Sequence, residues 1–156
     1  MLEDTDTAQG QLQRVDHLIY VTLKYTRTAD VILNALQRLV DAMDYIFEDI
    51  LELAKRKGMV SVIPKSHVEK TALIEEKVMK GLKPSKDAIK MYFVIRKLLN
   101  AKNPKGREEY RKNVTLVVEG MEVNQERLME FFVKTKEYYA FTKEWLAEQE
   151  GKKSKK

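Results

Sequence analysis

The sequence predicts an all-α fold, a bundle of about five helices. Glycine and proline are scarce, at six and three residues of 156, so the chain offers few turn signals. Apolar residues recur at steps of three and four over long stretches, the period of an amphipathic helix. Residues that favour helix ends stand at the borders of these stretches. The apolar content of 44% is that of a globular chain.

The first helix is expected over residues 11–25, where the apolar side chains share one face. The second is expected from Thr28, a suitable N-cap, to Gly58. A single rod over both would be much longer than a domain of this size, so we expect a break at residues 26–28.

The second helix carries the strongest pattern in the sequence. Two adjacent apolar rows cover an arc more than about 100° wide. One neighbouring helix cannot cover such an arc, so the pattern predicts a bundle, a dimer partner, or both. The rows are Leu33, Leu36, Val40, Met43, Phe47, Ile50 and Ala54, with Ile32, Leu39, Ile46 and Leu53 beside them.

Two further helices are expected in the middle of the chain. Ser66 and Glu69 have the spacing of a capping box, which predicts a third helix ending at Gly81. Pro84 restarts a fourth helix, which ends before the Asn103-Pro104 turn.

The last third of the chain begins with a β-branched run. Residues 114–123, with Glu119-Gly120 in their middle, predict a short β-hairpin or an extended loop. Asn124 can cap a last long helix with an aromatic stripe.

The two termini of the chain differ in composition from the segment between them. Residues 1–9 are polar and expected to be disordered, and residues 151–156 form a basic tail. Residues 10–150 are expected to form a single helical-bundle domain. The N-terminus resembles no secretory signal, and no apolar stretch reaches the roughly 18 residues of a spanning helix. We therefore expect a cytoplasmic protein that does not enter a membrane.

The sequence lacks the residues that several kinds of metal site and catalytic site require. Cysteine is absent, which excludes disulfides, thiolate metal sites and cysteine nucleophiles. Of the two histidines, His17 is predicted to be a surface residue and not a general base, and His67, in the first turn of the third helix, is assigned no role. No phosphate-binding loop, dinucleotide fingerprint or serine-hydrolase motif occurs. The sequence therefore predicts no catalytic residue and no cofactor.

Four carboxylates, Asp41, Asp44, Glu48 and Glu52, follow helical spacing in the second helix. Paired carboxylates bind Mg²⁺ or Mn²⁺ in helical nucleotide hydrolases. At 100° per residue, however, most of the row lies opposite the apolar arc. We expect these carboxylates to face solvent and to bind no metal. A metal-dependent nucleotide hydrolase that uses them is kept as a third hypothesis.

Positive charge is concentrated in one segment. Residues 77–112 carry 12 basic and 3 acidic residues, whereas residues 1–76 carry 9 and 13. Clustered cations can contact phosphates, but they also form solvated faces or dock on acidic surfaces. The candidate nucleic-acid contacts are Lys80, Lys83, Lys86, Lys90, Lys97 and Arg111.

A second set of residues is apolar and aromatic. At helical spacing, such side chains form a core or a dimer interface more often than a ligand site. The candidate core or dimer-interface residues are Phe47, Ile50, Tyr138, Tyr139 and Trp145.

The layout is similar to that of the HEPN-like helical bundles of archaea and bacteria. These are small all-α domains, often dimeric, that partner nucleotidyltransferases or act as RNases. Their nuclease signature places His after Arg with four to six residues between. Here Arg14-Val15-Asp16-His17 is too short, and the run from Arg107 to Val114 has arginines but no histidine. The resemblance therefore implies a non-catalytic member.

Taken together, these patterns predict a non-enzymatic interaction module that forms a homodimer. The alternative is a nucleic-acid-binding protein that uses residues 77–112. An acidic protein is a further candidate partner.

Overall fold

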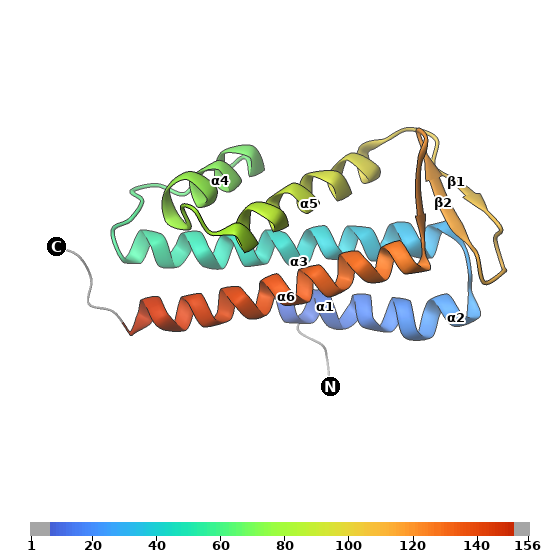
Figure 1. The fold of residues 1–156 in the computed structure, drawn as a ribbon, viewed down its shortest axis with the longest axis horizontal. Helices are drawn as coiled ribbons and strands as arrows, with labels where there is room; N and C mark the ends of the chain where they lie inside the picture. The colour runs from blue at the N-terminus through green and yellow to red at the C-terminus, as the bar shows by residue number, and fades with distance from the viewer. Residues whose placement is uncertain (1–6, 152–156) are drawn as a thin grey trace.

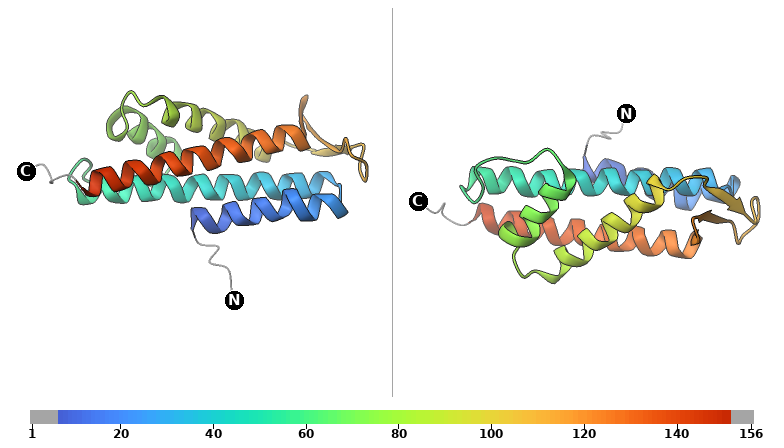
Figure 2. Two further views of the ribbon diagram at one scale, coloured as in Figure 1. Left: turned by 60° about the horizontal axis from the view of Figure 1, so that its bottom comes forward. Right: turned by 90° about the horizontal axis from the view of Figure 1, so that it is seen from above.

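The computed structural model describes residues 7–151. It is about 70% helical, with five helical rods and one small three-stranded antiparallel sheet, so the predicted helical bundle is confirmed in outline and the sheet extends the hairpin predicted near residues 114–123 by one strand. Three of the rods lie roughly along one long axis, the other two cross it obliquely, and the sheet closes one end (Figure 1 and Figure 2). The first six residues, and all of the expected basic tail except Gly151, fall outside the described residues.

The first rod is built of α1 (Ala8–His17), a π-helical segment η1 (Leu18–Thr22) and α2 (Leu23–Tyr25). It begins three residues before the predicted start, because the Thr7 side chain caps it by accepting from the Gly10 amide at 3.0 Å. The chain leaves helical geometry at Thr26, which confirms the expected break.

The central rod is α3 (Ala29–Arg56), which packs against α1, α4, α5, α6 and the sheet. Thr28 caps it as predicted, accepting from the Val31 amide at 3.4 Å. Both apolar rows of α3 are buried except Leu33, which is partly buried. The wide arc is therefore covered within one chain, and a dimer partner is not needed to cover it.

The third rod comprises α4 (His67–Leu73) and a second π-helical segment, η2 (Ile74–Val78). Ser66 caps it by accepting from the Glu69 amide at 3.1 Å. The turn that follows contains Gly81 at φ +79°, a conformation that favours glycine. The next helix, α5 (Lys83–Asn100), begins with the predicted proline and runs obliquely over α3 and α6 (Figure 2).

The sheet consists of β1 (Lys105–Arg107), β2 (Thr115–Val118) and β3 (Met121–Asn124), in the order β1-β2-β3. The predicted hairpin is β2–β3, where Leu116 pairs with Val123 and both side chains are buried. β1 was not predicted, because Lys105-Gly106-Arg107 is exposed and carries no alternating pattern.

The last helix, α6 (Gln125–Glu150), runs back along the whole molecule, antiparallel to α5 (Figure 1). Asn124 caps it as predicted, accepting from the Arg127 amide at 2.8 Å. Across residues 7–151, none of the helices has the length and apolar character required to traverse a bilayer.

Candidate binding groove

The six basic residues singled out from the sequence lie in three places. Lys80 is in the turn after η2, and Arg111 is in the loop between β1 and β2. The other four lie along α5, and all six side chains are exposed. They therefore come from a turn, a helix and a loop, and not from one element. Two of them, Lys83 and Lys90, meet residues of α6 at the border of a groove.

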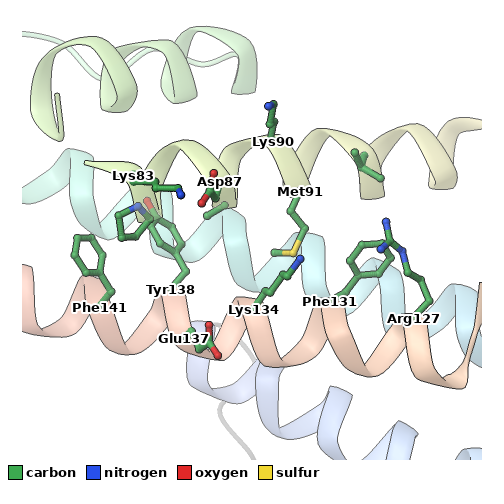
Figure 3. A pocket seen from close by; sticks show the side chains of 13 residues that line it. Lys83, Asp87, Lys90, Met91, Arg127, Phe131, Lys134, Glu137, Tyr138 and Phe141 are labelled. Atoms are coloured by element: carbon green, nitrogen blue, oxygen red, sulfur yellow. The ribbon is translucent and has the colours of Figure 1, made fainter. Parts of the chain in front are cut away.

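This α5–α6 groove has a volume of about 750 Å³. Figure 3 shows the two antiparallel helices that form its walls, with side chains from both directed into the space between them. Its floor is apolar. The floor residues are Pro84, Ala88, Met91 and Val94 of α5, and Phe131, Tyr138 and Phe141 of α6.

The floor is anchored by Tyr138. Its hydroxyl lies 3.0 Å from the Ser85 hydroxyl, which is fully buried, and its ring stacks on Phe141 with centroids 6.3 Å apart. Burial raises the pKa of Tyr138 to about 12, so the phenol stays protonated at neutral pH. Tyr138 therefore serves as a neutral wall of the groove.

The rim is charged, with four cations and two carboxylates. The cations are Lys83, Lys90, Arg127 and Lys134, and the carboxylates are Asp87 and Glu137. In Figure 3, Arg127 and Lys134 rise from α6 toward α5, whereas Glu137 lies toward the far side of α6 and Lys90 toward the far side of α5. The α6 side of the border carries two cations and one carboxylate, so its net charge is positive.

Three of the rim cations have no ion-pair partner among the described residues. Arg127 pairs with Glu130 at 3.3 Å and lies over the Phe131 ring at 4.6 Å from its centroid. Within the described part of the chain, no salt bridge joins Lys83, Lys90 or Lys134 to a carboxylate. These ammonium groups are available to an incoming anion.

A second groove lies on the other side of α5, against α4 and η2, with a volume of about 560 Å³. It shares Lys83 and Lys90 with the first groove, but its border is electrically balanced. Lys83, Lys86 and Lys90 stand beside Glu75, Glu76 and Asp87. An excess of cations therefore distinguishes the α5–α6 groove from its neighbour.

The candidate core or interface residues lie mostly inside one chain. Phe47, Ile50, Tyr138 and Trp145 are buried, and Tyr139 is partly buried. Phe47 packs edge-on against Tyr92 with ring centroids 5.0 Å apart. These four buried side chains are not available to a second copy without opening the bundle.

The acidic row of α3 is divided among separate partners. Asp41 accepts a hydrogen bond from the side-chain amide of Gln37 at 3.0 Å, and Asp44 accepts one from the Tyr92 hydroxyl at 2.6 Å. Glu48 pairs with Lys70 of α4 at 3.0 Å. Among residues 7–151, no three His, Asp or Glu side chains are grouped so that they could hold a metal ion.

Sequence reasoning missed Arg127, Lys134, Met91 and Val94 as groove residues. A signal for the α6 wall was present, since the positions alternate steps of four and three along one helical face. These positions are Arg127, Phe131, Lys134, Tyr138 and Phe141. The α5 wall has the same spacing, with Pro84, Asp87, Met91 and Val94 at steps of three, four and three, but buried core side chains such as Ala88 and Met91 are mixed into it, so its pattern did not separate a groove face from a core face.

Comparison with known proteins finds no matching family model, no similar curated protein and no similar solved structure, so the HEPN-like resemblance stays a prediction that rests on architecture.

Proposed function

We propose that this protein is a non-enzymatic interaction module that binds a partner in the α5–α6 groove. One observation carries the proposal: an open, apolar-floored groove of about 750 Å³ is bordered by lysines that have no carboxylate partner among residues 7–151. Grooves with an apolar floor and a few charged groups at the rim are the usual form of a binding site.

The lining favours binding over chemistry. Its hydroxyl, on Tyr138, is buried and engaged by Ser85. The other polar groups at the border are charges held on exposed side chains. Such a surface offers apolar contact and charge, and it holds no paired nucleophile and base in hydrogen-bond contact.

A peptide-display selection on the full-length protein tests the proposal. Val94 lines the groove and is 41% exposed, whereas Val133 is 38% exposed and lies on α6 outside the lining. Val94→Glu and Val133→Glu therefore make the same chemical change on similarly exposed helical surface.

Selected peptides are expected to bind the wild type and Val133→Glu alike, and to bind Val94→Glu at least about tenfold more weakly, because a charge replaces an apolar contact. Peptides that bind all three proteins equally, or no enrichment at all, would contradict a binding function of the groove.

The loop between β1 and β2 favours a second candidate function, the binding of single-stranded nucleic acid. Tyr110 is 75% exposed and is held at φ +67° in this loop. Its amide donates to the Arg27 carbonyl at 2.6 Å, which places the loop near Tyr25, itself 84% exposed. Exposed aromatic rings among cations can stack bases and contact phosphates.

A fluorescence titration with oligo(dT) tests this second candidate. Affinity should fall steeply as salt rises, and Tyr110→Ala should weaken it by about tenfold. Tyr20→Ala is the control, because Tyr20 is half-exposed on η1 and lies outside the loop. An affinity for oligo(dT) that changes neither with salt concentration nor in the Tyr110→Ala variant would exclude this function.

A further inference from the structure

We infer that the occupant of the α5–α6 groove is an acidic amphipathic helix from another protein. The inference rests on the proposed function, and it adds the secondary structure and the charge of the partner. Three features of the groove support it: the nature of its walls, its length, and the sign of its rim.

The helical walls of the groove favour a partner whose main-chain hydrogen bonds are all made within the partner itself. α5 and α6 are helices, so their main-chain amides and carbonyls are bonded within each helix along the groove. An extended peptide gains main-chain hydrogen bonds only at a sheet edge, and the groove has none. A helix brings its backbone already bonded and can pack its side chains into the furrow between two helices.

The length of the groove fits about three helical turns. The lining of α5 extends from Lys83 to Val94, a rise of about 16 Å at 1.5 Å per residue. A partner helix of this length presents apolar side chains at positions i, i+3, i+4 and i+7 on one face. They would contact Met91 and Val94 on one wall and Phe131 and Phe141 on the other.

The rim selects the charge of the partner. Four cations against two carboxylates leave a positive border, and Lys83, Lys90 and Lys134 lack ion-pair partners among the described residues. Glutamates flanking the apolar face of the partner would lie beside these lysines. A second copy of this chain seated by the same groove would oppose like charges, so self-association through it is disfavoured.

The test uses two synthetic peptides of about 14 residues with the same leucine face. In one peptide the flanking residues are glutamates, and in the other they are lysines. Both are capped at their ends and carry a fluorophore. Fluorescence anisotropy with the full-length protein should show that the acidic peptide binds at least about tenfold tighter, with affinity that falls as salt rises.

Two matched variants locate the effect. Lys134 lines the groove, whereas Lys97 is an exposed lysine of α5 outside it. Lys134→Glu should weaken the acidic peptide about fivefold and strengthen the basic one, while Lys97→Glu should change both by less than about twofold. Circular dichroism should show the acidic peptide gaining helix on binding.

Each alternative gives a distinct result. Equal binding of the two peptides, sensitive to Val94→Glu, would overturn the acidic partner and leave the proposed function intact. Binding of sodium laurate with no binding of either peptide would show that the groove takes an anionic amphiphile, and would overturn the inference. Failure of every probe to respond to Val94→Glu would contradict the proposed function itself.

Discussion

The hydroxyl of Tyr92 on α5 donates a hydrogen bond of 2.6 Å to the carboxylate of Asp44 on α3. Tyr92 is fully buried, and the Arg96 guanidinium lies 5.6 Å from the centre of its ring. Burial, and then the bond to Asp44, raise the pKa of Tyr92. This contact fixes α5 on the central helix, and so it positions one wall of the groove.

Removing this hydroxyl should destabilise the protein modestly. Tyr92→Phe keeps the ring in the core but leaves Asp44 without its donor, and water can replace it in part because Asp44 is exposed. We expect a loss of about 1 kcal/mol in the free energy of unfolding, measured by urea denaturation at pH 7. Tyr139→Phe, at a partly buried ring, should change it by less than about 0.5 kcal/mol. Equal losses in both variants would contradict the role of the bond.

The same contact should give stability a pH dependence of known sign. Although Asp44 as a whole is exposed, the protein around its contact with Tyr92 partly desolvates the carboxylate, and this raises the pKa of Asp44 above its ordinary value of 3.8, outweighing the hydrogen bond from Tyr92, which lowers it. Between the unfolded and the folded pKa, the native state binds more protons than the unfolded chain, so stability falls as pH rises through that window.

Asp44→Asn retains an acceptor for Tyr92 and removes this titration. The stability of the variant relative to wild type should therefore increase as pH rises from about 4 to 6, and then level off. Urea titrations at several pH values check this. A relative stability that decreases with pH would show that the pKa of Asp44 is lowered in the folded state.

The chain is expected to sediment as a monomer. The wide apolar arc of α3 is buried by its own chain, and the groove carries like charges that oppose pairing. Analytical ultracentrifugation at about 100 μM checks this. A dimer that persists in high salt and in the Val94→Glu variant would support the homodimer expected from the sequence, formed through another surface.

Divalent cations should leave the thermal stability unchanged. Asp41, Asp44 and Glu48 are each bonded to a different side chain, so they do not converge on one ion. Millimolar Mg²⁺ or Mn²⁺ should shift Tm by less than about 1 °C, because an ion that does not bind the native state cannot stabilise it. A rise in Tm that depends on the concentration of the cation and is lost in Glu48→Gln would support the hypothesis of a metal-dependent hydrolase.

The sequence predicted those parts of the fold that are encoded locally. Thr28 and Asn124 cap helices in the structure because an N-cap acts within three residues of itself. β1 was missed because it forms only through pairing with β2, where Gly106 faces Leu116. Its own residues carry no strand pattern.

The groove could not be predicted for a related reason. Lys83 and Lys134 are 51 positions apart in the chain, and only the antiparallel packing of α5 and α6 brings both to one border. The basic residues could be identified in the sequence, but the sequence did not show which of them border one of the two grooves: Lys83, Lys86 and Lys90 do, whereas Lys80, Lys97 and Arg111 do not. Periodicity shows which face of a helix is apolar, but it does not show whether a neighbouring element covers that face or leaves it exposed.

Methyl NMR of the full-length protein with the acidic peptide tests the central claim most directly. Met91 and Val94 line the groove, and Val133 on α6 is an internal reference outside it. The account predicts saturable shifts of the Met91 and Val94 methyl signals with no shift of Val133. Shifts confined to Val68 and Ile89, in the groove between α4 and α5, or no saturable shift at all, would contradict it.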